Sequence, residues 1–191
     1  MENKELLFDA LEKLPVQYGA FKAKIIDAWK IETDKSFRDM CKANFCGLYG
    51  KCWMCPPDAG DIEELMSLVG RFEYALVYQT VSKLEDSFDY EGMVSAKKQT
   101  YKIAMDLRQQ FGEMFSGKAL HLGCGGCGVC DTCAKRLDKP CRFPELAMSS
   151  LEAYGINVSQ LANASDMKYT NGTDTVTYFG AVLFSFGGES K

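Results

Sequence analysis

Histidine is nearly absent from this sequence, because His121 is the one histidine among 191 residues. A His-based catalytic triad and a histidine-rich metal site are therefore not expected. Positive charge is not in excess either, since 22 Lys and Arg residues stand against 26 Asp and Glu residues, for a net charge of −4. Such a chain lacks the basic surface that binds nucleic acids and anionic membranes, so we expect neither as a partner.

Long apolar runs are also missing. Stretches such as 75–78 and 181–184 are far too short to cross a membrane, and the first residues lack the pattern of a signal peptide. The phosphate-binding Gly-x4-Gly-Lys-Ser/Thr motif does not occur, nor does the nucleophile elbow of hydrolases. We therefore expect a cytoplasmic protein without a membrane partner.

Helix and strand signals alternate along a chain of ordinary globular composition, 47% hydrophobic and 25% charged. This predicts one domain over residues 1–191, of the α/β class, with a small mixed β-sheet packed against helices and two cysteine-rich metal-binding loops. Ser149 and Glu152 have the spacing of a capping box, for a short helix that Gly155 would end. After an N-terminal amphipathic helix, we expect helices over 35–43, 62–69, 90–115 and 158–164, and strands over 21–31, 72–81, 119–122 and 175–186.

Cysteine, in contrast, is abundant, with nine residues in two groups. Clustered thiols in a reducing compartment bind metal more often than they form disulfides. In the later group, four cysteines follow one another at three-residue steps and a fifth comes eight residues further on. One loop of this spacing can hold three irons of a [4Fe-4S] cluster, with a remote cysteine on the fourth. We expect the cluster ligands Cys127, Cys130, Cys133 and Cys141.

Two alternatives stay open for this loop. The cluster could begin at Cys124 and leave out Cys133, or the thiols could hold structural zinc. His121 could add a ligand, although a packed imidazole is the simpler interpretation.

The earlier cysteine group can supply four thiolates, although only its last pair has the Cys-x-x-Cys spacing. A second cluster or a zinc ion would suit it, and a cluster with three protein thiolates would leave one iron open to a substrate. Tyr49 and Trp53 could shield such a cluster or could be ordinary core aromatics. The candidate ligands are Cys41, Cys46, Cys52 and Cys55.

The motifs resemble the cysteine-rich predicted metal-binding protein family of unknown function (DUF2284) of anaerobic bacteria and archaea. The resemblance implies metal binding, most simply as iron–sulfur, and it treats Cys52 and Cys124 as additions to the common pattern. The motifs are Cys41-x4-Cys46-x2-Tyr49-Gly50, Trp53-x-Cys55-Pro56-Pro57, Gly126-Cys127-x2-Cys130-x2-Cys133, Cys141-Arg142-x-Pro144 and Ser150-Leu151-Glu152-Ala153-x-Gly155-Ile156. The ligands that it implies are Cys41, Cys46, Cys55, Cys127, Cys130, Cys133 and Cys141.

Three functions follow from these patterns. The first is an iron–sulfur protein of an anaerobe that transfers electrons or does redox chemistry, with a redox protein or a small-molecule substrate as its partner. The second is a zinc-stabilised, non-catalytic binding module. The third is an enzyme with an open iron, in which Arg142 would hold an anionic substrate and, by the resemblance, Tyr49 and Glu152 would handle protons. The sequence does not decide whether the protein is an enzyme.

Overall fold

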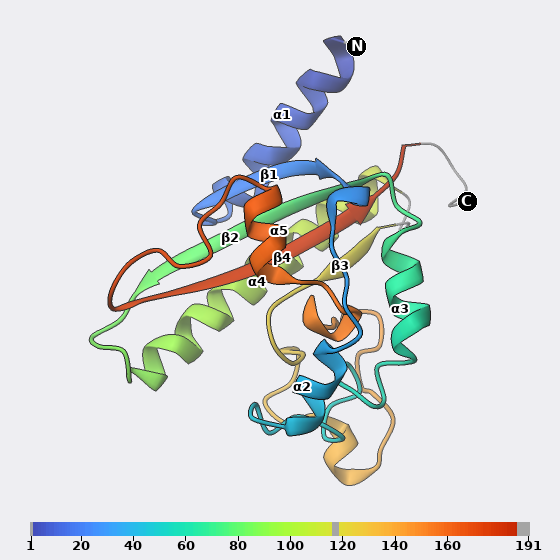
Figure 1. Ribbon diagram of the computed structural model, residues 1–191, viewed down its shortest axis with the longest axis vertical. Helices are drawn as coiled ribbons and strands as arrows, with labels where there is room; N and C mark the ends of the chain where they lie inside the picture. Colours follow the sequence, from blue (N-terminus) through green and yellow to red (C-terminus); the bar gives the residue numbers. More distant parts are fainter. Residues whose placement is uncertain (1, 116–118, 187–191) are drawn as a thin grey trace.

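The centre of the computed structural model, which describes residues 2–115 and 119–186, is a four-stranded sheet flanked by helices (Figure 1). The predicted α/β class is confirmed. All three ladders of the sheet are antiparallel, and the described ranges contain parallel pairing only as an isolated bridge between Gly123 and Ser150. The sheet is thus antiparallel, where a mixed sheet was predicted. The alternation of helix and strand signals does not determine whether two strands joined by a long connection run parallel or antiparallel. The strands, in their order across the sheet, are β1 (Lys22–Asp27), β2 (Tyr74–Lys83), β4 (Thr175–Phe184) and β3 (Leu120–Leu122).

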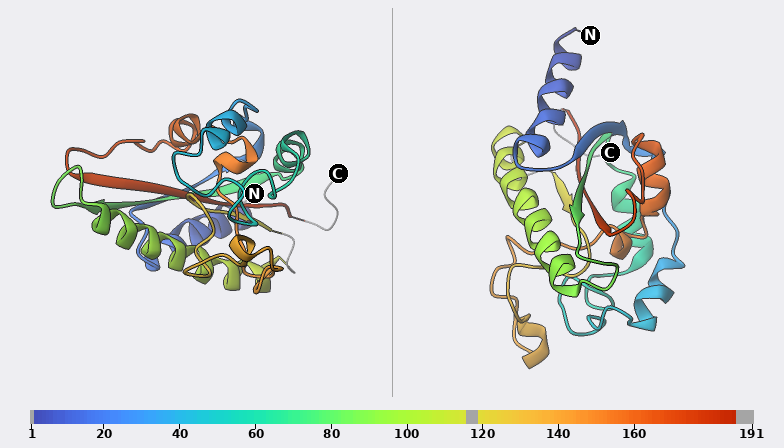
Figure 2. Two further views of the ribbon diagram at one scale, coloured as in Figure 1. Left: turned by 90° about the horizontal axis from the view of Figure 1, so that it is seen from below. Right: turned by 90° about the vertical axis from the view of Figure 1, so that its left-hand side faces the viewer.

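Both faces of the sheet are covered, because its central strands carry apolar side chains on each side. In β2, Ala75 and Val77 face one core while Leu76 and Tyr78 face the other. Figure 2 shows α1 and α4 beneath one face, with α2, α3 and α5 on the opposite side. The helices are α1 (Glu2–Gln17), α2 (Phe37–Ala43), α3 (Ile62–Val69), α4 (Tyr90–Met114) and α5 (Val158–Ala164).

Two helices have the bounds that their caps predict. The Asp61 carboxylate accepts two backbone N–H groups at the start of α3, and the Asn157 side chain accepts one at the start of α5. The capping box at Ser149 is wrong: the hydroxyl of Ser150 accepts the N–H of Ala153 instead, over 3.2 Å. The segment Glu152–Tyr154 is a single 3₁₀ turn, so no α-helix is present for a box to cap.

Other boundaries shift for local reasons. The first strand ends at Asp27 because Ala28–Lys30 forms a 3₁₀ turn, which leaves Trp29 79% exposed. The first and last residues of α4 lie outside the core, since Tyr90 is 75% and Met114 46% exposed. No helix in the described ranges is both long and apolar enough to span a bilayer.

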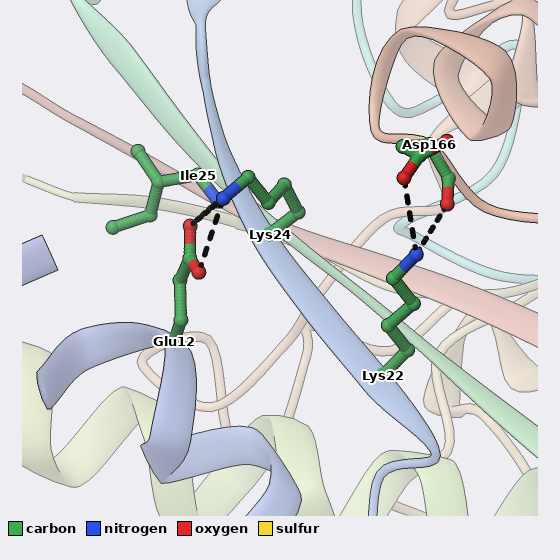
Figure 3. A network of polar contacts seen from close by, with 5 residues as sticks. All are labelled: Glu12, Lys22, Lys24, Ile25 and Asp166. Atoms are coloured by element: carbon green, nitrogen blue, oxygen red, sulfur yellow. Dashed lines mark hydrogen bonds and ion pairs between the residues drawn. The ribbon is translucent and has the colours of Figure 1, made fainter. Parts of the chain in front are cut away.

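Polar contacts join β1 to both layers of helices (Figure 3). From α1, the Glu12 carboxylate accepts the backbone N–H of Ile25 over 2.8 Å and lies 3.2 Å from the ammonium of Lys24. On the other side, Lys22 donates to the carbonyl of Asp166, just beyond α5. The edge strand is therefore held from above and below.

Both cysteine-rich loops lie beyond one end of the sheet, at the bottom of Figure 1. The later loop leaves the sheet at Gly123 and returns to the same residue, which bonds to the backbones of Ser149 and Leu151. The earlier loop begins beside the same segment, because the N–H of Asp34 donates to the carbonyl of Gly155 over 2.7 Å. The stretch 149–157 thus holds the base of both loops. That residues 1–191 form a single domain stays a prediction.

Candidate metal centre

Local hydrogen bonds give the earlier loop a compact shape. Asn44 ends α2 in the left-handed conformation, with φ of 56°, and its side chain accepts the N–H of Tyr49 over 3.0 Å. Further on, the N–H of Gly50 donates to Pro56 and that of Cys55 to Cys52, each over 2.9 Å. These turns fold the chain back on itself and bring its thiols toward the later loop.

The later loop is supported by α4 and by its own backbone. The hydroxyl of Tyr101 lies 3.8 Å from the sulfur of Cys127. Its ring packs so closely that a Cβ atom on Gly128 would come within 3.1 Å of it. The guanidinium of Arg142 donates to the carbonyl of Thr132, which joins two parts of the loop. The Tyr101 phenol is half-buried, and burial raises its pKa above the usual range.

Five thiols from the two loops line one small pocket, of about 20 Å³. The rest of the lining is apolar or aromatic apart from Arg142, and it includes no carboxylate and no imidazole. Sulfur is therefore the only metal-ligand chemistry that the pocket offers. The five residues, which we call the five-thiol pocket, are Cys52, Cys127, Cys130, Cys133 and Cys141.

Cys52 is the link between the loops, because it belongs to the earlier one and faces the thiols of the later one. It is 2% exposed, and a hydrogen bond from Cys55 lowers the pKa of its thiol to about 6. The same hydrogen bond raises the pKa of the Cys55 thiol, and burial raises it further. Of the two thiols, Cys52 is therefore the more acidic, and the thiolate is the form that binds metal.

The remaining thiols of the earlier loop line a second, larger cavity of about 450 Å³. This three-thiol cavity contains Cys41, Cys46 and Cys55, together with Tyr49 and Glu152. Burial raises the pKa of the Cys41 thiol; the charge of Arg38 opposes this increase, and Cys46 and Glu152 add to it. The expected set of four thiols is thus divided, with Cys52 at the other pocket. How many of these thiols bind a metal stays a prediction.

The thiols share pockets without converging on one point. Within residues 2–115 and 119–186, no three Cys, His, Asp or Glu side chains lie close enough together to hold a single metal ion. The chemistry of the donors is nevertheless specific, because a set made only of thiolates selects soft metals such as zinc, copper(I) and iron–sulfur clusters. The five-thiol pocket fits such a group in donor type and in number.

Two residues that the sequence placed near the later group line neither cavity. Cys124 is half-buried, and burial raises the pKa of its thiol to about 12. His121 packs edge-on against the ring of Phe111, with 6.1 Å between ring centres, and burial lowers the pKa of its imidazole to about 4. His121 is thus a packed side chain, and the ligand register that leaves Cys124 out stays a prediction.

Sequence reasoning missed an ionic contact between the loops. Lys135 pairs with Asp58 and lies over the ring of Trp53, whose indole N–H donates to the carbonyl of Lys139 over 2.9 Å. It also missed the contact of Tyr101 with Cys127. No spacing rule connects these residues, because their partners lie 26 or more positions away along the chain.

A family comparison agrees with this donor chemistry. The family described as predicted metal-binding protein (DUF2284) matches residues 24–184. The chain belongs to this family. The predicted resemblance is therefore confirmed, and family membership supports a metal cofactor without specifying which one. No curated protein and no solved structure matches the chain.

Proposed function

We propose that this protein binds a [4Fe-4S] cluster through Cys127, Cys130, Cys133 and Cys141 and serves in electron transfer. The observation that carries the proposal is the five-thiol pocket, in which sulfur is the only available donor. Cysteine thiolates are the usual ligands of iron–sulfur clusters, and successive Cys-x-x-Cys steps suit the separate corners of a cubane. Cys52, from the earlier loop, is the fifth thiol of the pocket.

The surroundings suit a redox centre. The side chains of Trp53, Val129 and Phe143 line the five-thiol pocket and limit the access of water. Arg142 brings a positive charge to the same lining, which compensates negative charge gathered on thiolates. When bound, a cluster of this kind supplies one-electron oxidation and reduction. We propose a redox protein or a small molecule as the partner and the cytoplasm of an anaerobe as the setting, with no role for nucleic acid or membrane.

A second centre is proposed at the three-thiol cavity. Cys41, Cys46 and Cys55 provide three sulfur ligands beside open space. A metal or cluster held there would keep one position for a ligand that is not part of the chain. Redox catalysis, and not only electron transfer, would then be within the reach of this protein.

Structural zinc is the second candidate function. It is favoured by the small volume of the five-thiol pocket, about 20 Å³, since a single ion needs less space than a cubane. Four cysteines are a common zinc ligand set. In that case the protein would be a metal-stabilised binding module without redox activity.

Metal and sulfide analysis after purification without oxygen separates the two candidates. The proposal expects about four irons and four acid-labile sulfides per occupied cluster site, a brown colour and an electron paramagnetic resonance signal after reduction. A colourless protein with stoichiometric zinc and no labile sulfide would replace the iron–sulfur proposal with the zinc module.

A further inference from the structure

The three-thiol cavity has a lining unlike that of the five-thiol pocket. Aromatic and aliphatic side chains make up much of its wall, among them Phe37, Phe45, Val158 and Tyr169. Its volume of about 450 Å³ lies in the range of pockets that hold small organic molecules. A metal held by the thiols alone would not need this space, so the cavity suits a ligand with an apolar body.

The charges of the wall restrict the ligand further. Glu152 is the only Asp, Glu, Lys, Arg or His residue in the lining. Its carboxylate is half-buried and accepts no hydrogen bond and makes no ion pair within the described ranges. Phosphorylated or carboxylated molecules would find no cation in the lining and would be repelled by this carboxylate.

Two cations near the cavity contact its backbone and do not line it. Arg38 donates to the carbonyl of Ala153 over 3.2 Å, and Lys97 approaches the backbone of Gly125. Neither residue lines the cavity. The Glu152 carboxylate is therefore the group that a positively charged ligand would meet.

We propose that the three-thiol cavity binds a small organic amine, with its ammonium group against Glu152 and its apolar body against the aromatic wall. The charge of the amine matches the unpaired carboxylate, and aromatic faces favour a neighbouring cation. This inference deepens the proposed function, on which it rests for the role of Cys41, Cys46 and Cys55, because the ligand would lie beside the second centre. Binding itself depends on the wall and not on which metal the thiols hold.

Calorimetric titration with three matched probes tests this assignment. 2-Phenylethylamine, 2-phenylethanol and phenylacetate share an apolar body and carry positive, zero and negative charge. The amine is expected to bind about tenfold more tightly than the alcohol, and phenylacetate least well. Glu152→Gln should weaken the binding of the amine about tenfold and leave the binding of the alcohol unchanged. The control variant Glu145→Gln, at an exposed position, should change the binding of neither probe.

A second pair of variants locates the bound probe. Ser159 is exposed on α5 and lines the cavity, so Ser159→Trp should occupy part of the cavity and weaken the binding of the amine and of the alcohol together. Gln160 is its exposed neighbour and does not line the cavity, so Gln160→Trp is the matched control. The inference is overturned if phenylacetate binds as well as the amine, if Glu152→Gln has no effect on the amine, if Ser159→Trp has none, or if the amine does not bind at millimolar concentration.

Iron and labile sulfide are measured on the same protein sample. Amine binding by a sample that holds only zinc would support the cavity assignment and overturn the iron–sulfur proposal. A sample with the expected iron and sulfide but no amine binding would support the iron–sulfur proposal and overturn the cavity assignment.

Discussion

The Nζ atom of Lys135 lies 2.7 Å from the Oδ1 atom of Asp58, so an ion pair joins the two cysteine-rich loops. The two side chains are only 19% and 17% exposed, and the ammonium group lies 4.2 Å from the centre of the Trp53 ring. Asp58→Asn would leave the cation without its partner where water has little access. We expect this variant to lose about 2 kcal/mol of unfolding free energy, measured by urea titration.

The matched control is the pair of Lys35 and Glu63, which are 73% and 65% exposed. Glu63→Gln should change the unfolding free energy much less, because water screens the pair. Equal losses of unfolding free energy in the two variants would show that the ion pair between the loops stabilises the fold no more than an exposed ion pair does.

Serine substitutions of cysteine should divide the thiols by pocket. Cys130→Ser removes a donor from the five-thiol pocket and is expected to lower the iron content. Cys124→Ser should keep the iron content of the parent protein, because Cys124 lines neither cavity. Iron and sulfide analysis of oxygen-free preparations measures both, and an iron loss in the Cys124 variant with none in the other would exclude the proposed register.

A side chain at Gly180 should disrupt the centre of the sheet. Gly180 lies opposite Tyr78 in the ladder of β2 and β4, and a Cβ atom there would come within 2.3 Å of the buried phenol oxygen. The ring has little room to move, so we expect Gly180→Ala to cost about 2–3 kcal/mol. Gly112 is exposed in α4 with nothing close to it, and Gly112→Ala should instead stabilise by up to about 1 kcal/mol. Thermal and urea unfolding measure both effects.

His121 should make stability depend on pH. Burial lowers the pKa of its imidazole from 6.5 to about 4, so between these values the unfolded chain binds more protons than the folded one. Stability is therefore lost as the pH falls from 6.5 toward 4, by up to about 3 kcal/mol from this group. His121→Phe keeps an aromatic ring beside Phe111, and this variant should lose less unfolding free energy than the parent protein as the pH falls from 6.5 toward 4. Urea titrations at a series of pH values give the difference, and parallel curves for the two proteins would contradict the assignment.

Local rules predicted the regular elements well and their ends less well. The caps at Asp61 and Asn157 gave α3 and α5 their bounds, because a side chain that accepts the first N–H groups is a local signal. The end of β1 at Asp27 and the exposure of Tyr90 depend on which other elements pack nearby, and the hydrophobic periodicity of a segment carries no information about them. The order of the strands also depends on long connections and was not predicted.

For the candidate site, cysteine spacing indicated the later loop as a metal site. It did not indicate how the thiols are distributed between the two cavities. Cys52 belongs to the earlier group along the chain and to the five-thiol pocket in space. That assignment depends on the hydrogen-bonded turns from Asn44 to Pro56 and on contacts between distant loops. Similarly, Asp58 and Lys135 have ordinary neighbours in sequence and meet only in the folded chain.

The bridge between Gly123 and Ser150 separates the later cysteine loop from the register of the sheet. The 26 residues between them start and finish at one point, so a change within this loop does not have to alter the pairing of β3 with β4. Under the proposed function, the α/β scaffold would therefore not depend on a bound cluster for its strand register.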